Sequence, residues 1–394
     1  MTIDYLAEAR ALRDDIVARR RDFHRYPELA FEEVRTAGIV AGVLRGLGME
    51  VRMGVGKTGV IGELEGRDEG PAVLVRADMD ALPVDEATGA PYASTVPGKM
   101  HACGHDGHTA VALAVAQILS AHRDQMAGRV RFVFQPAEEL AGGALSVIAD
   151  GALDDPKPDV CLGLHLWSQL KAGTISIYEG PIMAAADNFV VTVRGSGGHG
   201  GLPQQTRDPV VAAAQIIVAL QSVVSRDISP MDAAVVSVCR VNAGRGFNVI
   251  PDKAELAGTF RTYTTTVRDI LRARAEAIIT GVAAAMGCEA TLEVMPLTTP
   301  VRNDPTVTAQ VREAVVNALG AEVLGEEVRV MGAEDMSAYL DRVPGCFMFV
   351  GTGNAAKGTD YPHHHPRFDL DEDVLPLAAA ALAAAAGRYV LPDR

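Results

Sequence analysis

The order of apolar segments along the chain restricts the fold more than any other feature of the sequence. In its first half, segments with helical periodicity alternate with continuously apolar ones: AVLVR at 72–76, RVRFVFQ at 129–135 and PDVCLGL at 158–164. Strands that are apolar on both faces are typical of parallel sheets covered by helices on each side. The sequence therefore predicts an α/β fold with a mostly parallel sheet.

A stretch in the second half of the chain follows a different pattern. Its strand-like segments alternate apolar and polar residues, as in NFVVTVRG at 188–195, and the expected elements follow the order β-α-β-β-α-β. This order is typical of a ferredoxin-like α+β unit. A chain of 394 residues is long enough for two domains. We therefore expect an α/β domain built from residues 1–185 and 297–394, with a ferredoxin-like domain inserted at 186–296.

The charge of the chain argues against two classes of partner. The formal net charge is −14, and the sequence contains no run rich in lysine and arginine. Nucleic acids and anionic membrane surfaces are bound through such runs, so we expect neither as a partner. The Ala-rich segment at 375–391 follows an acidic run, and we interpret it as a buried helix instead of a membrane span.

The N-terminus and the cysteines indicate a cytoplasmic protein. Residues 1–23 are amphipathic and charged, and they lack the apolar centre of a secretory signal. The five cysteines are odd in number and widely spread, which argues against a disulfide framework. Free thiols are typical of a reducing compartment.

Side chains that can bind metal gather at a few places in the sequence. Eight of the ten histidines fall into four clusters, at 101–108, at 165, at 199 and at 363–365. Three of these clusters follow apolar strands of the α/β part, as do Asp78, Asp80 and the pair Glu138–Glu139. The carboxyl ends of parallel strands meet at one edge of a sheet, so these side chains should converge there. We expect the two isolated histidines, His24 and His122, to be solvated turn residues.

The mixture of donors indicates what such a site binds. Thiolate, imidazole and carboxylate together are the ligands of a divalent transition metal. In KMHACGHDGHTA (99–110), Cys103 and His105 alternate with the small residues Ala102 and Gly104, which lets a tight loop turn both side chains inward. The sequence therefore predicts a metal centre to which this segment supplies two ligands.

The adjacent glutamates Glu138 and Glu139 need separate roles. Successive side chains of an extended backbone point to opposite sides, so the two carboxylates can face different groups. In a hydrolytic metal site one carboxylate binds the ion, while a second, unligated one accepts a proton from the attacking water. We therefore interpret the pair as one metal ligand and one general base.

Motifs in a fixed order over nearly the whole chain point to one enzyme family. They are HRYPELAFEE (24–33), RADMDALP (76–83), MHACGHDGHTA (100–110), FQPAEE (134–139), GLH (163–165), GHGG (198–201), FNVIPD (247–252), GTFRT (258–262), GAEDMS (332–337) and HHPRFDLDE (364–372). With these motifs the sequence resembles the M20 metallopeptidase clan. Within the clan it resembles the amidohydrolase branch, which contains hippurate hydrolases, auxin-conjugate hydrolases and N-acyl-amino-acid deacylases.

The resemblance implies a catalytic α/β domain with a two-metal centre and a ferredoxin-like lid that forms a homodimer interface. Glu138 would be the general base and Asp80 the carboxylate that orients the site. Zinc or manganese would be the metal, with cobalt and nickel as further candidates. Carried over position by position, the metal ligands would be Cys103, His105, Glu139, His165 and His364.

The lid would supply residues that contact the substrate. His199 would stabilise the developing oxyanion, in its own subunit or in that of the partner, and Asn248 and Arg261 would bind the substrate. The guanidinium fork of Arg261 suits a carboxylate. Within the run of three histidines, His363 and His365 remain rivals of His364 as the ligand. Many members of the clan have His-x-Asp where this chain has Asp78-Met79-Asp80, which shifts the supply of ligands toward Cys103 and His105.

The reaction expected from the resemblance is hydrolysis of the amide bond of a small N-acyl-amino acid, with Glu138 as the base. Two alternatives remain. A small-peptide carboxypeptidase or aminopeptidase would use the same centre, and it would prefer peptides that lack an N-acyl group. A non-catalytic metal-binding protein would need neither Glu138 nor His199.

Overall fold

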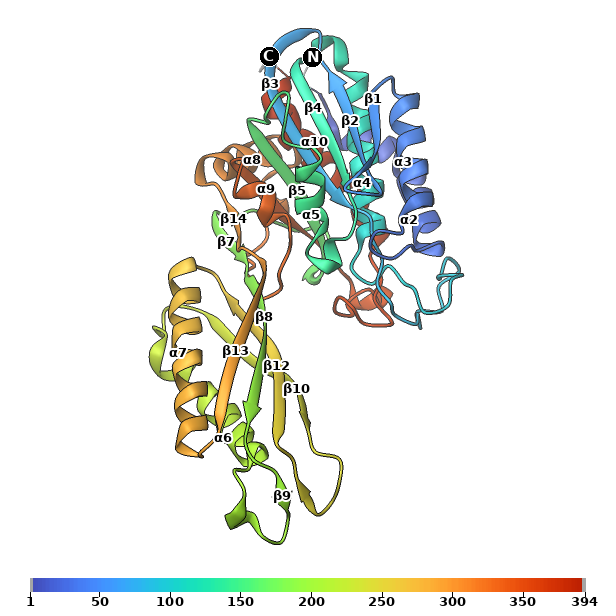
Figure 1. The fold of residues 1–394 in the computed structure, drawn as a ribbon. Helices are drawn as coiled ribbons and strands as arrows, with labels where there is room; N and C mark the ends of the chain where they lie inside the picture. The colour runs from blue at the N-terminus through green and yellow to red at the C-terminus, as the bar shows by residue number, and fades with distance from the viewer. Residues whose placement is uncertain (1–2, 392–394) are drawn as a thin grey trace. The chain divides into compact units, whose positions relative to one another are not determined.

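The chain forms two compact units, each built around its own sheet (Figure 1). The structure is a computed structural model that describes residues 3–391. Unit 1 contains the chain up to Gly180, Arg302–Val328 and the chain from Asp335 onward. Unit 2 contains Pro181–Val301 and Arg329–Glu334. The strands β7 (Gly180–Met183) and β14 (Val301–Asn303) lie where the chain passes from one unit to the other.

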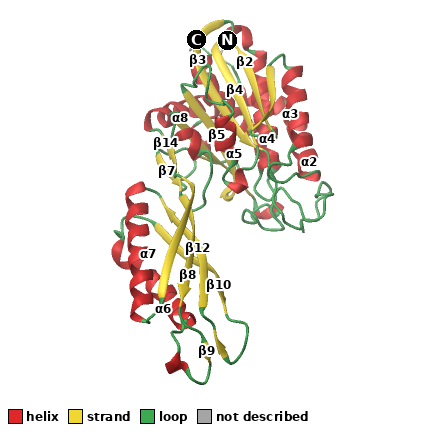
Figure 2. Ribbon diagram, in the orientation of Figure 1, coloured by secondary structure: helices red, strands yellow, loops and turns green. Residues whose placement is uncertain are grey.

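A seven-stranded sheet forms the centre of unit 1 (Figure 2). The four middle strands run parallel to one another, and antiparallel strands close both edges. The predicted α/β fold with its parallel sheet is confirmed, and the structure adds the antiparallel edges. In sheet order the strands are β1 (Glu50–Val55), β2 (Gly59–Glu65), β4 (Ala127–Gln135), β3 (Asp68–Asp78), β5 (Val160–Lys171), β15 (Gly345–Gly353) and β6 (Ile175–Ser176).

Helices cover both faces of this sheet. Alternate residues of β4, such as Phe132 and Phe134, point into a core shared with α4 and α10. On the opposite face Arg131 donates to the carbonyls of Ala152 and Asp154, just beyond α5. The helices of unit 1 are α1 (Tyr5–Ala11), α2 (Arg13–Arg25), α3 (Val34–Gly46), α4 (His105–Ala121), α5 (Gly143–Ala149), α8 (Pro305–Leu319), α9 (Ser337–Leu340) and α10 (Leu375–Val390).

The last helix, α10, is the buried helix that the Ala-rich segment predicts. Its alanines are almost fully buried, because small side chains let the helix pack closely against the strands and against α4 and α8. Two helical segments, Glu372–Val390 and Pro209–Asp227, are long and apolar enough to cross a membrane by length and composition alone. Core helices pass the same test, and 78% of the window in Glu372–Val390 is buried inside the protein.

Unit 2 has the predicted element order β-α-β-β-α-β. Its antiparallel sheet has the order β10-β12-β8-β13, and α6 and α7 pack together on one face (Figure 1). The core between helices and sheet includes Phe189 and Phe260, whose rings stack 4.4 Å apart. The elements are β8 (Ala185–Arg194), β9 (Gly198–His199), α6 (Pro209–Ser222), β10 (Ala234–Ala243), β11 (Val249–Ile250), β12 (Lys253–Thr262), α7 (Thr265–Ala285) and β13 (Glu289–Thr298).

One buried carboxylate ties the sheet of unit 2 to its long helix. Asp187 of β8 is 1% exposed, and it accepts hydrogen bonds from the guanidinium groups of Arg268 and Arg272 on α7. Burial alone would raise the pKa of Asp187, but the two arginines outweigh it and lower the pKa. The carboxylate therefore stays charged and holds α7 in place.

Two expectations about strands differ from the structure. The alternating apolar residues Val328 and Val330 predict a strand near 327–330, and this prediction is wrong, since Val330 makes a single bridge to Met183 and its neighbours are irregular. Strand β1 was not expected, because five of its six residues are partly or fully exposed and the segment lacks a continuous apolar run. Its position at an edge of the sheet explains the weak signal.

Candidate metal centre

The loop before α4 brings two predicted ligands to the edge of the parallel sheet. Gly104 has φ 91°, in the left-handed region that glycine adopts without steric cost, and α4 begins at the next residue. The Sγ of Cys103 lies 3.6 Å from Nε2 of His165 on β5. The ligand atoms of Cys103, His105 and His165 all lie within 4.8 Å of one another.

Two further triads extend this group. Cys103, Glu139 and His364 form one, and His105, Glu138 and Glu139 form the other, each with its ligand atoms within 4.8 Å. The Nε2 of His364 lies 3.4 Å from Oε1 of Glu139. Because Cys103, His105 and Glu139 each belong to two triads, all five predicted ligands and Glu138 lie in one connected cluster of unit 1.

The orientation of two imidazoles leaves one nitrogen of each facing the cluster. The Nδ1 of His105 lies 2.8 Å from the carbonyl oxygen of Asp80, and the Nδ1 of His165 lies 2.9 Å from that of Leu166. A carbonyl oxygen can only accept, so Nδ1 carries the proton and donates in both rings. This arrangement fixes each ring and leaves Nε2 as the nitrogen for a metal ion.

Two buried atoms in the cluster lack the partners that burial normally requires. The Nε2 of His105 and the Oε1 of Glu139 make no hydrogen bond among the residues that the structure describes, although Oε1 lies 3.4 Å from the Nε2 of His364. Leaving a buried polar atom unpaired costs about 1–3 kcal/mol. A divalent cation would satisfy both atoms, and the sulfur, nitrogen and oxygen donors match a transition metal. The residues therefore fit a metal centre held by Cys103, His105, Glu139, His165 and His364.

The pKa values of the predicted ligands shift in different directions, and contacts with Cys103 and Glu139 raise the pKa of His364 to about 10. Burial raises the pKa of the Cys103 thiol, and burial lowers the pKa of His165 far below its usual value. Without a cation the thiol therefore keeps its proton, and His165 is a neutral imidazole. A bound metal would favour the thiolate, so its binding to Cys103 would release a proton.

The carboxylate of Asp80 holds the turn that carries both glutamates. Its Oδ1 accepts the backbone N–H of Glu138 and its Oδ2 accepts that of Glu139, each at 3.0 Å. Asp80 is 1% exposed, so water does not compete for these hydrogen bonds. The contacts are those expected of a residue that orients the site.

The three histidines of the run 363–365 have different surroundings. The Nε2 of His363 donates to the carbonyl of Leu166 at 3.0 Å, and its ring packs on Trp167. The ring of His365 stacks on Tyr361. Among the residues that the structure describes, His364 is the member of the run that joins a potential metal-binding triad.

Sequence reasoning gave no role to a buried group behind the cluster. The Nδ1 of His108 donates to Asp78 at 2.6 Å, and its Nε2 accepts the N–H of Leu166 at 2.9 Å. Both nitrogens of His108 are therefore occupied, and the ring connects β3 to β5 instead of facing a metal ion. Arg76 donates to the other oxygen of Asp78 and also to Asp335. The sequence feature that could have indicated this buried group is the presence of the charged residues Arg76 and Asp78 in an otherwise apolar strand.

The expectation that His24 is a solvated turn residue is wrong. His24 is fully buried on α2, where its Nδ1 lies 2.8 Å from Oδ2 of Asp106 and its Nε2 lies 3.3 Å from Glu86. Arg20, one helical turn earlier, donates to the same oxygen of Asp106. The buried carboxylate of Asp106 needs these partners, because an unpaired charge inside a protein is costly.

The three predicted residues of unit 2 lie at two ends of its sheet. His199 pairs with Val249 across β9 and β11, and the N–H of Gly200 donates to the carbonyl of Asn248. His199 and Asn248 are thus neighbours, and both are exposed. They lie beyond the Lys253 end of β12, whereas Arg261 is eight residues further along that strand, a distance of about 26 Å. Figure 1 shows β9 at the end of unit 2's sheet where β8 ends and β12 begins.

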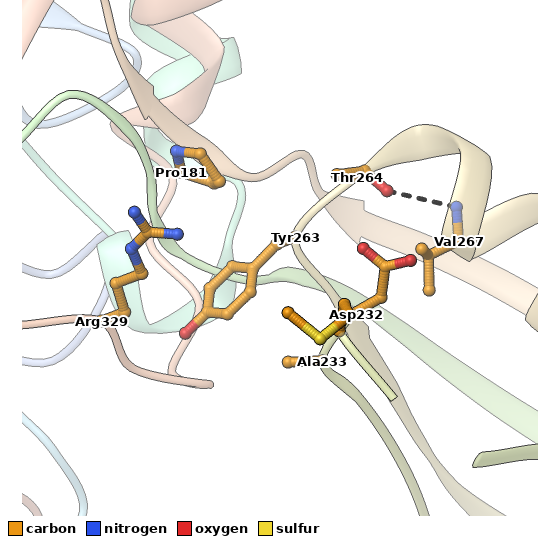
Figure 3. Close-up of a pocket in the computed structure, with 8 residues that line it drawn as sticks. Pro181, Asp232, Ala233, Tyr263, Thr264, Val267 and Arg329 are labelled. Atoms are coloured by element: carbon orange, nitrogen blue, oxygen red, sulfur yellow. Dashed lines mark hydrogen bonds between the residues drawn. The ribbon is translucent and has the colours of Figure 1, made fainter. Parts of the chain in front are cut away.

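Unit 2 also has a hollow of about 290 Å³ (Figure 3). The ring of Tyr263 lies at its centre in the view, between Arg329 and the side chains at the start of α7. None of the predicted site residues lines it. The lining residues are Pro181, Met231, Asp232, Ala233, Tyr263, Thr264, Val267 and Arg329.

The chain belongs to peptidase family M20/M25/M40, whose sequence profile matches residues 74–388. The resemblance to the M20 clan is therefore confirmed. The chain is 42% identical to an N-acetylcysteine deacetylase of Bacillus subtilis, over 95% of this chain and 96% of that protein. It is 39% identical to thermostable carboxypeptidase 1 of Saccharolobus solfataricus, over 97% of each chain.

A solved structure from Bacillus subtilis, described as a dinuclear metal-binding peptidase of family M20, is also similar. It matches with a TM-score of 0.84 and 38% sequence identity, covering 96% of this chain and 98% of that one. The likeness extends over both units, so the fold is that of the family.

Proposed function

We propose that the protein is a metal-dependent amidohydrolase that cleaves the amide bond of N-acyl-amino acids. The observation that carries the proposal is the position of Glu138. Its carboxylate lies within 4.8 Å of ligand atoms of His105 and Glu139, on a turn that Asp80 fixes. A protein that only stores metal does not need such a carboxylate beside its ligands. The similarity to a protein named N-acetylcysteine deacetylase supports the substrate class.

The metal and the protein supply different parts of the reaction. A divalent ion held by Cys103, His105, Glu139, His165 and His364 would polarise the amide carbonyl and lower the pKa of a water to about 7. Glu138 accepts the proton of the attacking water, and it later returns that proton to the leaving nitrogen. Asp80 keeps Glu138 in position through its backbone N–H. We propose zinc or manganese as the physiological metal.

The lid residues complete this proposal. We assign residues 1–185 and 297–394 to the catalytic domain and residues 186–296 to a lid and dimerisation domain. His199 would hydrogen-bond the developing oxyanion, while Asn248 and Arg261 would bind the substrate. Arg261 is partly buried, which strengthens its attraction for a substrate carboxylate. All five cysteines are free, which supports a cytoplasmic location.

A peptidase is the second candidate, and one comparison favours it. Thermostable carboxypeptidase 1 is 39% identical over 97% of this chain, so the fold and cluster alone do not separate the two reactions. The substrates differ in one group, since an N-acyl-amino acid has no free amino terminus whereas a small peptide has one. Substrate preference therefore decides between the candidates.

The first test measures that preference in reconstituted protein. Chelated protein is loaded in parallel with zinc, manganese, cobalt or nickel, and amino-acid release is measured from N-acetyl- and N-benzoyl-amino acids and from unblocked dipeptides. We expect kcat/KM for the acylated substrates to exceed that for dipeptides at least about tenfold. A preference for dipeptides would identify a peptidase, and metal binding without any release would contradict both reactions.

We also propose that the protein is a homodimer in which His199 acts in the active site of the partner. Within one unit 2, about 26 Å of strand separates His199 and Asn248 from Arg261, which is too far for one small substrate to contact all three. A dimer removes this conflict if each site takes His199, together with its neighbour Asn248, from the other subunit. The exposed Val210, Val211 and Val218 on α6 and the open edge of β10 are surfaces for such an interface.

Subunit mixing tests this arrangement. Glu138→Gln and His199→Ala proteins should each be nearly inactive alone. In a mixed dimer with shared sites, one site combines an intact Glu138 with an intact His199, so equal mixing should restore roughly a quarter of the wild-type activity. No recovery after confirmed subunit exchange would place His199 in its own subunit, and a monomer in sedimentation analysis would overturn the dimer.

A further inference from the structure

A buried carboxylate next to the metal cluster has no role in the function proposed so far. Glu33 has no exposed surface, although glutamate is almost never fully buried without a partner. Its Oε1 accepts the backbone N–H of Phe31 at 3.0 Å and that of Ala137 at 2.9 Å, and its Oε2 accepts the hydroxyl of Thr58. Glu33 is the N-cap residue of α3, but its side chain makes no capping hydrogen bond to that helix. The carboxylate therefore accepts hydrogen bonds only from groups outside α3 among those that the structure describes.

The contact with Ala137 reaches the turn that presents the general base. Ala137 has φ 54°, in the left-handed region that non-glycine residues rarely adopt, and Glu138 follows directly. A residue persists in this conformation when its surroundings hold it there. The hydrogen bond from the Ala137 N–H to Glu33 is such a constraint, and both residues are fully buried.

Glu33 and Asp80 together bind three consecutive backbone N–H groups. The N–H of Ala137 points to Glu33, and those of Glu138 and Glu139 point to the two oxygens of Asp80. Successive N–H groups beside a left-handed residue form a concave site for anionic oxygens. If Ala137 left this conformation, the two following N–H groups would turn away from Asp80, and the side chain of Glu138 would turn with them.

We propose that Glu33 is a positioning residue that holds Ala137 in its left-handed conformation and thereby fixes Glu138 for proton transfer. The inference rests on the proposed function, because it concerns the base of that reaction. It assigns a role to the last residue of HRYPELAFEE, a motif that the metal cluster leaves unexplained. Glu33 acts through the backbone of 137–139 and not through contact with the substrate or with a metal-ligand side chain.

A second glutamate of the same motif is a matched control. Glu28 is partly buried, and its two oxygens accept the backbone N–H groups of Arg35 and Thr36 at the start of α3. Glu28→Ala removes a carboxylate from two backbone donors, as Glu33→Ala does, but those donors do not belong to the turn of Glu138. A merely structural role for Glu33 predicts that the two variants behave alike.

The first experiment separates turnover from binding and folding. In metal-loaded Glu33→Ala we expect kcat to fall by roughly 10- to 100-fold, since small displacements of a reacting group have effects of this size. KM and metal content should stay near their wild-type values. Glu33→Gln keeps an acceptor oxygen for both N–H groups, so it should recover most of the kcat. Glu28→Ala should lower thermal stability while leaving kcat unchanged.

The second experiment reads the turn without substrate. Amide hydrogen exchange of the segment containing 137–139 should become faster in Glu33→Ala and stay unchanged in Glu28→Ala. Glycine adopts the left-handed conformation without steric cost, so Ala137→Gly added to Glu33→Ala should slow this exchange and restore part of the kcat. If Glu33→Ala does not fold, Glu33→Asp, which keeps the charge but shortens the side chain, must show the same loss of kcat.

Several outcomes would overturn the inference. One is a wild-type kcat in Glu33→Ala, or in Glu33→Asp when Glu33→Ala does not fold. Another is a loss of bound metal that parallels the loss of activity. The third is that the Glu33 and Glu28 variants show the same changes in kcat and stability. A failure of the proposed function looks different, because the wild-type protein would then hydrolyse no acylated substrate. In that case faster exchange at 137–139 in Glu33→Ala would still support the role of Glu33 in the turn.

Discussion

Replacing Glu138 by glutamine should reduce kcat by about 10²- to 10⁴-fold while the protein keeps its metal. The amide of glutamine has nearly the shape of the carboxylate, but it cannot accept the proton of the attacking water. The backbone N–H of residue 138 still donates to Asp80, so the turn keeps its conformation. The loss therefore falls on kcat, with smaller effects on KM.

The neighbouring glutamate is the matched control for this variant. Glu139 belongs to triads with Cys103 and His364 and with His105, and its buried Oε1 makes no hydrogen bond among the described residues. Glu139→Gln should lose bound metal, so its activity should depend on the metal concentration in the assay. Metal content and turnover of both variants are measured after dialysis. Near-normal turnover in metal-loaded Glu138→Gln would remove Glu138 from the role of base.

Much of the fold could be predicted because its signals are local. Continuous apolar runs such as 129–135 are found in strands buried on both faces, and the Ala-rich segment at 375–391 forms a helix buried almost all round. Edge strand β1 gave no comparable signal, since most of its side chains are exposed. The segments that could be predicted are therefore the buried ones, because buried segments carry the hydrophobic pattern.

The metal cluster could be predicted for a topological reason. Cys103, His105, Glu139 and His165 lie at or after neighbouring strands of a parallel sheet, whose carboxyl ends form one edge. Their proximity therefore follows from strand order and does not require side-chain detail. The choice among the three histidines at 363–365 does require it, because adjacent residues of a loop differ only in the direction of their side chains.

The supports of the cluster could not be predicted from residue type. Glu33 and His24 are polar residues, yet both are fully buried. Their burial depends on partners distant in sequence, Ala137 for Glu33 and Asp106 for His24. Such pairing is a property of the folded chain, and a single sequence contains no local pattern for it.

The histidine run leads to the second large effect. His364→Ala should weaken metal binding by about 100-fold or more at one position of the centre, since even residues that only support a ligand contribute 10- to 100-fold. His363→Ala should keep its metal. Its ring is partly buried, donates to the carbonyl of Leu166 and packs against Trp167 and Phe368, so its removal leaves a gap beside these rings and takes one of two donors from that carbonyl, which keeps His165.

Thermal unfolding of the metal-free proteins separates these roles. We expect His363→Ala to lose about 2 kcal/mol of stability, at the low end of the range for large-to-small changes in a core, because its ring is only partly buried. His364→Ala should lose little stability, because 54% of the His364 side chain is exposed. Its contact with Glu139 is also weak, since Nε2 lies 3.4 Å from Oε1. In metal titrations of the same samples, His364→Ala should lose more metal affinity than His363→Ala. If His363→Ala loses the metal while His364→Ala keeps it, the ligand is His363, and the loop turns by one residue when the metal binds.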